Sequence, residues 1–405
     1  MNVLIVEEAL ESQHGHWFQY LRDMVEDGRA AGHRVDVLGH QNACPEIRRT
    51  LGAHPVLRRS VWQNNSERPR RWARIRSLIA HNRSLFEDVA AWAKSRGERY
   101  DLTIFPTVRI DHLWALHRLA CHHRSQLGRL VAIFPEAQGS WNQEGKLISP
   151  RSSFPLSVVM RWVGRAAASS HILFATESIG LIRQYEAFCG LRLSYLPHTT
   201  SMPEHLVWKD SGKKVLDFGL FGFMRYDKGA DLLHQALHSN AFKPQQKLNL
   251  HVQWTGDYKL PNGELITQDQ QLASQGKVNY IPPFKTSEEY HTWLTRIDAM
   301  ILPYREGFYK DKLSRVAIDA ALVGLPMVYP RRTWLESFVE EFGAGVPFEP
   351  ASSDSLAEAV CKLAEDHRRL VNLALERRNR VRDAFSGRHF FNLLSDSLES
   401  GYGHL

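Results

Sequence analysis

The sequence predicts an α/β protein built from two consecutive Rossmann-like domains. Its 405 residues exceed what one hydrophobic core usually supports, so two domains of about 200 residues each are expected. Apolar strand-like runs alternate with helix-periodic segments, which is the pattern of a parallel, doubly wound sheet. The alternation restarts after the polar, proline-containing stretch 197–214, which we interpret as the linker between the domains.

The first half contains strand-like runs that are each followed by a helical or polar segment. These runs are residues 3–6, 35–38, 102–105, 130–134 and 171–175. The turn after the first run contains Gly15 and His16 instead of a G-x-G-x-x-G fingerprint, which argues against a dinucleotide-dependent oxidoreductase. Ligands bind at the carboxyl ends of strands in such sheets, so Gly15, His16 and Glu136 are candidate site residues. The alternatives are a packing role for His16 and an exposed loop position for Glu136.

The second half repeats the same order of elements. Its strand-like runs are residues 215–221, 248–254, 278–281 and 299–303, and helical patterns cover 230–237 and 287–294. Further helical stretches continue to the end of the sequence. We therefore expect an N-terminal domain over residues 1–200 and a C-terminal domain over 201–385. A last helix, in 386–405, should return to the N-terminal domain.

The whole chain has a net charge of +7. The positive charge is concentrated in its first half. Eight arginines lie between Arg58 and Arg83 against a single acid, and apolar residues recur at helical spacing over 72–89. The segment predicts a basic amphipathic helix. Such a helix can lie on an anionic membrane, or it can pack its apolar stripe on the core and leave a solvated basic face. No nucleic-acid-binding module accompanies the arginines, so we expect no nucleic-acid partner.

The cysteines and the hydropathy pattern limit the cellular setting. The four cysteines, Cys44, Cys121, Cys189 and Cys361, are widely spaced and form no C-x-x-C pair. They therefore predict neither a disulfide framework nor a structural zinc site. No run of about 18 apolar residues occurs, and the first residues do not resemble a signal peptide. We expect a cytoplasmic protein, with the basic helix as the candidate for peripheral contact at the inner membrane face.

A glycine-rich stretch of the second half carries the first chemical motif. An apolar run leads into Gly222, two cations follow at Arg225 and Lys228, and Gly229 precedes a helix-periodic segment. A strand, turn and helix in this order place backbone N–H groups and the positive end of a helix at the carboxyl end of the strand. Two cations there would complement a diphosphate. Taken alone, the stretch is equally consistent with an ordinary turn that exposes two cations to solvent.

The second motif follows the strand that ends at Pro303. Asp311, Ser314 and Asp319 precede a Gly324-Leu-Pro exit into another apolar run. The pattern predicts a helix whose first turn holds Asp311 and Ser314. The N–H groups of a helix start can bind phosphate, and an acid two turns later can accept hydrogen bonds from ribose hydroxyls.

The two motifs together resemble the GT-B retaining glycosyltransferases of family 4, the glycogen synthase-like group. The resemblance rests on G-x-x-R-x-x-K-G, a strand ending in Pro-Tyr, acid-x7-acid and G-x-P-x-V, and it covers most of residues 200–390. It implies the GT-B fold, in which two Rossmann-like domains face each other across a cleft. It also implies transfer of a sugar from a nucleotide sugar to a hydroxyl acceptor with retention of anomeric configuration.

The resemblance also implies roles for individual residues. Arg225 and Lys228 would hold the donor diphosphate, Asp311 would lie near the donor sugar, and Asp319 would bind the ribose. Catalysis would therefore depend on Arg225, Lys228 and Asp311. The residues implied in donor binding are Gly222, Arg225, Lys228, Glu306, Ser314 and Asp319. Both aspartates depart from the family pattern, which has glutamate at each position, and Glu306 is an alternative donor contact.

The expected chemistry needs no cofactor. The two cations would stabilise the charge that develops on the leaving diphosphate, and no D-x-D metal signature occurs in the sequence. We therefore expect neither a metal nor a cofactor. Gly15, His16 and Glu136 would then bind the acceptor, which is a glycan, a lipid-linked molecule or a small molecule. The alternatives are a GT-B-fold epimerase acting on a nucleotide sugar, and a non-catalytic GT-B-like binding or scaffold protein.

Overall fold

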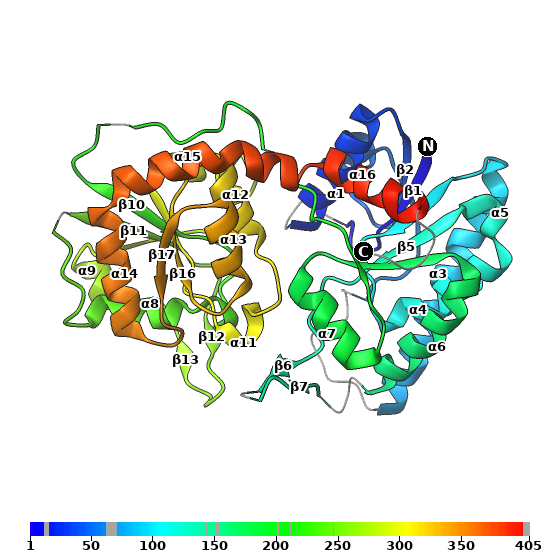
Figure 1. Cartoon of the computed structure of the whole chain (residues 1–405), viewed down its shortest axis with the longest axis horizontal. Helices are drawn as coiled ribbons and strands as arrows, with labels where there is room; N and C mark the ends of the chain where they lie inside the picture. Colours follow the sequence, from blue (N-terminus) through cyan, green and yellow to red (C-terminus); the bar gives the residue numbers. More distant parts are fainter. Residues whose placement is uncertain are drawn as a thin grey trace. The chain divides into compact units, whose positions relative to one another are not determined.

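The chain forms two compact units (Figure 1). A computed structural model describes residues 1–11, 16–61, 71–142, 144–150, 154–200, 202–210, 212–245 and 247–399. The first unit consists of Met1–Thr200 and Phe385–Leu405, and the second of Ser201–Ala384.

The first unit contains a parallel sheet of seven strands in the order β3-β2-β1-β4-β5-β8-β9. The strands are β1 (Asn2–Val6), β2 (Arg34–His40), β3 (Ala53–Leu57), β4 (Leu102–Phe105), β5 (Arg129–Ile133), β8 (Ile172–Thr176) and β9 (Ser194–Tyr195). The order reverses between β1 and β4. In doubly wound sheets the ligand site lies at the carboxyl ends of the strands that flank such a reversal.

Helices bury both faces of this sheet. They are α1 (His16–Ala30), α2 (Pro45–Leu51), α3 (Arg71–Arg96), α4 (Ile110–His122), α5 (Arg124–Leu127), α6 (Phe154–Ser170) and α7 (Ile179–Cys189). Leu4 and Val6 of β1 belong to one apolar core, and Val3 and Ile5 belong to another. Alternate side chains of a strand point to opposite faces, so β1 is apolar throughout because both of its faces are covered.

The end of the chain completes the first unit. Helix α15 (His367–Ala384) belongs to the second unit, whereas α16 (Gly387–Glu399) packs beside α1 (Figure 1). Phe390 and Phe391 of α16 are buried in the core that contains Val3 and Ile5. The Gly387 N–H donates a 2.7 Å hydrogen bond to the Asp27 carboxylate.

The second unit repeats the doubly wound arrangement with six parallel strands in the order β14-β11-β10-β15-β16-β17. The strands are β10 (Leu216–Leu220), β11 (Leu248–Gln253), β14 (Val278–Ile281), β15 (Ala299–Ile301), β16 (Met327–Pro330) and β17 (Gly345–Phe348). The reversal falls between β10 and β15. Each of the two sequence motifs directly follows one of these two strands.

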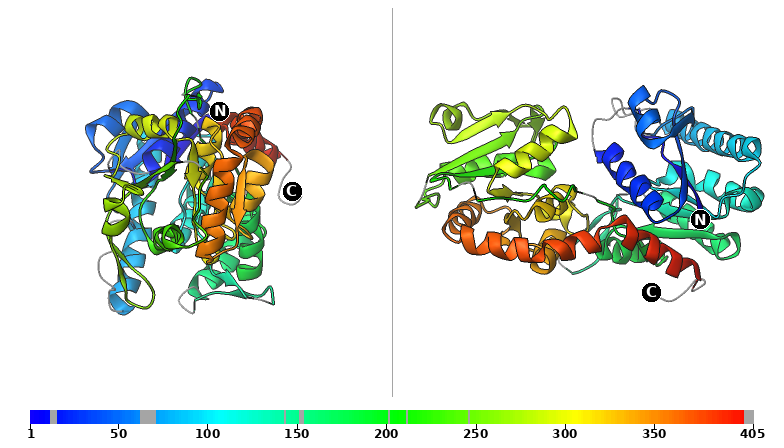
Figure 2. Two further views of the ribbon diagram at one scale, coloured as in Figure 1. Left: turned by 90° about the vertical axis from the view of Figure 1, so that its left-hand side faces the viewer. Right: turned by 90° about the horizontal axis from the view of Figure 1, so that it is seen from above.

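Helices cover the second sheet on both faces (Figure 2). They are α8 (Ala230–His238), α9 (Gln270–Ser274), α10 (Ser287–Arg296), α11 (Glu306–Tyr309), α12 (Arg315–Val323), α13 (Trp334–Phe342), α14 (Ser353–Glu365) and α15. Two short antiparallel hairpins occur, β6 (Ser140–Trp141) with β7 (Leu147–Ile148) in the first unit and β12 (Tyr258–Lys259) with β13 (Leu265–Ile266) in the second.

The predicted fold class, two parallel Rossmann-like sheets with helices, is confirmed. Elements that the sequence reading missed include β3, α2, α6 and α7. Strand β3 contains Pro55 and lies at the sheet edge, where a proline is tolerated but weakens the strand pattern. Helix α6 exposes several apolar side chains, and this obscures its amphipathic period. Within the described residues, no helix is both long enough and apolar enough to cross a bilayer.

Candidate functional site

The glycine turn after β10 places two cations at the sheet reversal. Gly222 has φ 117° and Gly229 has φ 70°, which are left-handed conformations that favour glycine. A Cβ atom on Gly229 would lie 1.9 Å from the Pro303 carbonyl oxygen. No other residue fits there, so the turn that follows β10 lies directly against the end of β15.

Lys228 is buried beneath the second motif. Its Nζ lies 3.8 Å from the ring centroid of Tyr304 and 4.7 Å from that of Tyr309, and only 8% of the residue is exposed. No ion pair that involves Lys228 occurs among the described residues. Burial raises the pKa of Tyr309 to about 12, and the Lys228 charge opposes that shift. Two aromatic faces therefore hold an ammonium group that has no carboxylate neutralising it.

Arg225 is held by a neighbouring acid. Its Nε and a terminal nitrogen each donate a 3.0 Å hydrogen bond to the Asp227 carboxylate, and the side chain is about half exposed. Burial would lower the pKa of Arg225, but Asp227 outweighs it and raises the pKa. Tyr309 donates a 3.3 Å hydrogen bond to Asp227. The guanidinium is thus oriented by a fork-to-fork pair, with part of its surface open to solvent.

The second motif differs in one respect from its predicted geometry. Helix α12 begins at Arg315 with Ser314 as its N-cap, and the Ser314 hydroxyl accepts from the Ala317 N–H at 3.4 Å. Asp311 lies in a bend between α11 and α12. The prediction that Asp311 sits in the first helical turn is therefore wrong, because the serine, a better cap at this position, starts the helix three residues later.

Asp319 is buried on α12 and already has two partners. It accepts hydrogen bonds from Arg315 Nε at 2.9 Å and from the Tyr290 hydroxyl at 3.1 Å. The predicted alternative, Glu306, begins α11 and lies 3.6 Å from Arg332. The Asp319 carboxylate is therefore part of a small hydrogen-bonded network with Arg315 and Tyr290.

The structure brings the two motifs together in one place. The Arg305 N–H donates to the Asp227 carbonyl at 3.0 Å, the Arg305 side chain pairs with Asp231, and Lys228 lies over Tyr304. The N-termini of α8 and α12 follow these contacts. Exposed cationic surface beside two helix N-termini can bind a diphosphate. Sequence reasoning missed Asp227, Tyr304 and Tyr309, although an acid two residues after an arginine is a readable signal for pairing.

The candidate residues of the first unit are only partly described. Gly15 lies outside the described residues, and the His16 side chain is not described either. Glu136 lies partly buried in the loop after β5. Its carbonyl accepts from the Tyr185 hydroxyl at 3.0 Å and from Gln138 Nε2 at 3.2 Å. The loop that carries Glu136 is therefore anchored from α7.

A buried acidic pair that the sequence reading missed occupies the reversal point of the first sheet. Glu7 and Glu8 directly follow β1, and both side chains are almost fully buried. Glu7 accepts hydrogen bonds from the Thr107 hydroxyl at 2.7 Å and the Ala9 N–H at 2.9 Å. Burial raises the pKa of Glu7 to about 7. The sequence signal for this acidic pair was its position directly after the first strand, where ligand sites of such sheets lie.

Glu8 lies between two buried histidines. His81 Nε2 is 2.8 Å and His112 Nε2 is 3.4 Å from the Glu8 carboxylate. Burial alone would raise the pKa of Glu8, but His112 and His81 outweigh it and lower the pKa.

The Glu8, His81 and His112 ligand atoms lie within 4.8 Å of one another, close enough for a metal ion. However, His112 Nδ1 accepts the Arg109 N–H at 3.0 Å. In the neutral ring the proton then lies on Nε2, which leaves no lone pair there for a metal. We interpret the three residues as a buried carboxylate–histidine cluster.

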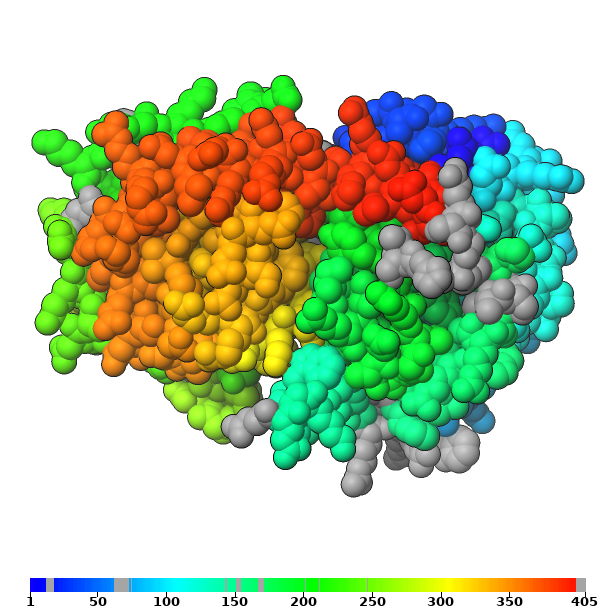
Figure 3. Space-filling model, in the orientation of Figure 1, coloured from blue at the N-terminus to red at the C-terminus, as the bar shows by residue number. Residues whose placement is uncertain are grey.

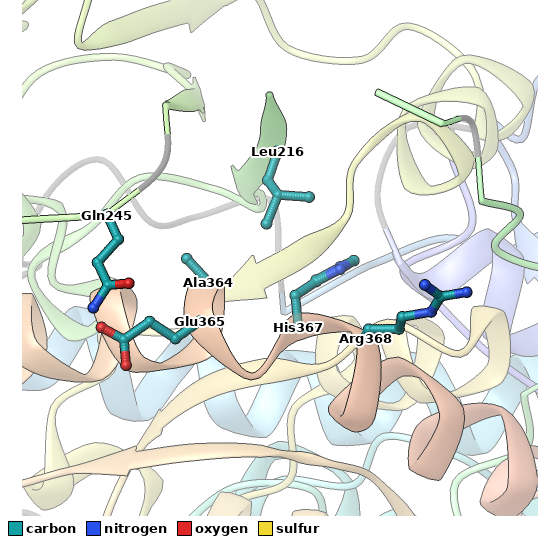
Figure 4. A pocket seen from close by; sticks show the side chains of 6 residues that line it. All are labelled: Leu216, Gln245, Ala364, Glu365, His367 and Arg368. Atoms are coloured by element: carbon teal, nitrogen blue, oxygen red, sulfur yellow. The ribbon is translucent and has the colours of Figure 1, made fainter. Parts of the chain in front are cut away.

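The pocket of about 420 Å³ in Figure 4 is separate from the glycine turn. It is lined by Leu216, Gln245, Ala364, Glu365, His367 and Arg368. Leu216 is the first residue of β10, whereas the glycine turn follows its last residue, Leu220. The pocket is therefore at the amino edge of the sheet, away from the expected ligand edge.

Comparisons with known proteins find a family match for most of the second unit. Residues 216–366 match the family model described as "Glycosyl transferases group 1". No curated protein sequence matches the chain significantly.

Solved structures resemble the whole chain at low sequence identity. HepE of Anabaena, in complex with UDP and glucose, is 16% identical with a TM-score of 0.62, covering 99% of this chain and 100% of that one. Sucrose-phosphate synthase of Thermosynechococcus elongatus is 15% identical with a TM-score of 0.64, covering 98% of each chain. WaaG, a glycosyltransferase involved in lipopolysaccharide biosynthesis, is 13% identical with a TM-score of 0.58, covering 99% and 100%. The predicted resemblance to GT-B glycosyltransferases is confirmed.

Proposed function

From the match of residues 216–366 to the model described as "Glycosyl transferases group 1", we propose a specific reaction for the chain. The chain is a glycosyltransferase with the GT-B fold. It transfers a sugar from a nucleotide sugar to a hydroxyl acceptor, retains the anomeric configuration and needs no metal. The acceptor is a glycan or a lipid-linked molecule, and the reaction takes place in the cytoplasm.

One observation carries this proposal, namely the buried Lys228 ammonium at the sheet reversal. Its Nζ lies over the rings of Tyr304 and Tyr309, and no acid among the described residues forms an ion pair with it. The N-terminus of α8 lies directly beside it. A diphosphate is the group in a nucleotide sugar that matches a fixed cation beside a helix N-terminus.

The same groups support bond breaking as well as binding. When the bond between the sugar and the diphosphate breaks, negative charge increases on the diphosphate. Lys228 and Arg225 are held in place before the reaction, so they would stabilise that charge without rearranging. Asp227 orients Arg225 through two hydrogen bonds, and Asp319 would accept from a ribose hydroxyl. The roles of Gly222, Ser314, Glu306 and Asp311 as further donor contacts belong to the same proposal.

Gly15, His16 and Glu136 remain our candidates for acceptor contacts in the first unit. The acids Glu7 and Glu8 lie at the carboxyl edge of the same sheet. A neutral Glu7 could donate a hydrogen bond to an acceptor hydroxyl if a ligand reached it, since its pKa is raised to about 7.

Thermal shift measurements test the donor site. The purified chain would be heated with UDP-, GDP-, dTDP- and ADP-sugars, beginning with UDP-glucose because that ligand occurs in a HepE structure. A ligand at 100 times its Kd stabilises a site by about 2.7 kcal/mol. We expect one nucleotide class to stabilise the chain, and Lys228→Ala to lose that effect. Lys259→Ala, on the β12–β13 hairpin, is the matched control.

Turnover separates transfer from the alternatives. Donor hydrolysis or transfer that is unchanged by EDTA supports a metal-independent glycosyltransferase. Release of an epimerised nucleotide sugar would instead identify an epimerase. Nucleotide binding without any turnover, in the presence of glycan and lipid-linked acceptors, would support the non-catalytic alternative. That alternative is motivated by Asp311 and Asp319, which stand where the family has glutamates.

A further inference from the structure

We propose that the outer face of α4 and α6 in the first unit docks on an anionic lipid bilayer. This α4–α6 face consists of Trp114, Phe154, Val158, Arg161, Trp162 and Arg165. It differs from the segment between Arg58 and Arg83 that the sequence suggested. In the structure, Arg58 and Arg83 of that segment form ion pairs with Glu87 and Asp88 of α3. Residues 62–70 lie outside the described residues.

Helix α6 exposes apolar side chains where a surface helix ordinarily exposes polar ones. Phe154, Val158 and Trp162 are 69%, 47% and 55% exposed. They recur every fourth residue, which places them on one side of the helix. Single exposed apolar residues are common, but a regular stripe of three large ones marks an interaction surface.

The basic residues of α6 share this exposed side. Arg161 and Arg165 lie seven and eleven residues after Phe154. At 100° per residue, both positions fall within about 20° of Phe154 around the helix axis. Both arginines are exposed, and the sequence of α6 contains no aspartate or glutamate. Arginine and tryptophan side chains can place their apolar parts among lipid chains while their polar ends remain at the headgroups.

Helix α4 extends the surface beside α6. Trp162 lies 4.8 Å from the His117 ring, and Trp114, one turn before His117, is 42% exposed. The guanidinium of Arg118 lies 5.5 Å from the Trp114 ring centroid. The acid on α4 is Asp111. Two neighbouring helices therefore present aromatic and cationic groups together, with α6 on the outer surface of the first unit (Figure 3).

Charge complementarity selects the bilayer as the occupant. The exposed charges of α6 are all positive, as expected for attraction to anionic headgroups. The chain also carries a net charge of +7. Apolar and aromatic side chains beside the arginines supply the insertion that a purely basic patch lacks.

The position of this face has a consequence that rests on the proposed function. Helix α6 is joined to the start of β8 by the single residue His171, so its first turn lies toward the carboxyl edge of the sheet. Phe154 in that turn is therefore at the same edge as Glu7 and Glu8. A bilayer bound there would bring a lipid-linked acceptor to the ligand edge of the first unit.

Vesicle flotation tests the docking proposal without requiring catalysis. We would compare phosphatidylcholine vesicles with vesicles in which about a third of the lipid is phosphatidylglycerol. The full chain should bind the anionic vesicles about tenfold more than the neutral ones. Phe154→Ser with Val158→Ser, and separately Arg161→Glu with Arg165→Glu, should each reduce the bound fraction about tenfold.

Matched controls lie in the second unit. Leu265→Ser removes an exposed leucine of β13, and Lys277→Glu with Arg380→Glu reverses two exposed charges; all should leave vesicle binding unchanged. Nucleotide-induced thermal shifts report on the donor site independently, so loss of flotation with an intact shift separates docking from the proposed reaction. Equal flotation of wild type and face variants would overturn the proposal. The proposal would also be overturned if the wild type bound no vesicles and light scattering showed it to be a dimer that the Phe154 and Val158 substitutions dissociate.

Discussion

At the scale of single residues, burial decides what each charged group can do. Lys228 and Glu7 are both enclosed, but Lys228 lies over two aromatic rings while Glu7 has two hydrogen-bond donors. Burial of the Glu7 carboxylate outweighs its two hydrogen-bond donors and raises the pKa of Glu7.

Removing the Lys228 charge should impair turnover more than folding. We expect Lys228→Met to lower kcat/KM for the sugar donor by about 100-fold or more, since a fixed cation at a developing charge contributes that much. The methionine keeps the buried chain, so the melting temperature should stay within about 3 °C. Steady-state kinetics and a thermal melt measure the two effects. Lys259→Met is the control, and a change below about threefold would contradict the assigned role.

Glu7 should make stability fall as the pH rises. Its folded-state pKa of about 7 lies above its ordinary value of 4.5, so between these values the folded state holds a proton that the unfolded state has lost. The stabilisation is fully present below about pH 4.5 and is lost as the pH rises through about 7. Glu7→Gln cannot titrate. The free energy of unfolding of Glu7→Gln minus that of the wild type should increase by about 3 kcal/mol from pH 4.5 to pH 8, measured by urea denaturation. A difference that does not change with pH would refute this.

At the scale of elements, the glycine turn is shaped by the strand beside it. The sequence shows that Gly222 and Gly229 interrupt a strand-to-helix connection, and the structure shows why Gly229 is required. Its Cα lies against the Pro303 carbonyl, a contact between segments more than seventy positions apart in the sequence. The pattern of a turn is local, but the reason for its glycine is not.

A methyl group at Gly229 should lower the free energy of unfolding far more than one at a turn glycine with open space around it. Gly229→Ala would place Cβ 1.9 Å from the Pro303 oxygen, so we expect a loss of about 3 kcal/mol or more. Gly263 has φ 90° but no atom within 4 Å of a built Cβ. Gly263→Ala should therefore cost only about 1 kcal/mol, from backbone strain alone. Chemical denaturation would measure both variants, and equal losses would show that the Pro303 contact is unimportant.

At the scale of the whole molecule, the last helix joins the end of the chain to its beginning. Phe390 and Phe391 of α16 are buried in the core of the first unit, although α15 before them belongs to the second. The residues that we propose for the donor site, in contrast, all lie within the second unit. Stability of the first unit should thus depend on residues far beyond it in sequence, whereas nucleotide binding should not.

Truncating Phe390 should destabilise the first unit selectively. A buried Phe→Ala change costs about 3–5 kcal/mol, so calorimetry of Phe390→Ala should show one transition moving to lower temperature. The nucleotide sugar should still raise the other transition, because the proposed donor site lies in the second unit. Phe348→Ala, buried in β17, should lower that nucleotide-sensitive transition instead. A nucleotide effect on the transition shifted by Phe390→Ala would contradict this division.

The sequence by itself determined the local parts of this protein. Strand and helix periods, the glycine turn and the cations Arg225 and Lys228 are readable because they depend on residues near one another in the chain. The order of these parts predicted two doubly wound units, and the resemblance of the two motifs to a known family predicted a glycosyltransferase. Asp311 shows the limit of such reading, since the same local pattern misplaced the start of α12.

Only the tertiary structure decided which groups meet and how deeply they are buried. Glu8 acquires His81 and His112 from two helices, and Lys228 acquires Tyr304 and Tyr309 from a different strand–helix connection. The exposure of Phe154 likewise depends on how the neighbouring helices pack around α6. Desolvation and partner geometry arise from long-range packing, and they set charge, pKa and surface character in ways that no local pattern encodes.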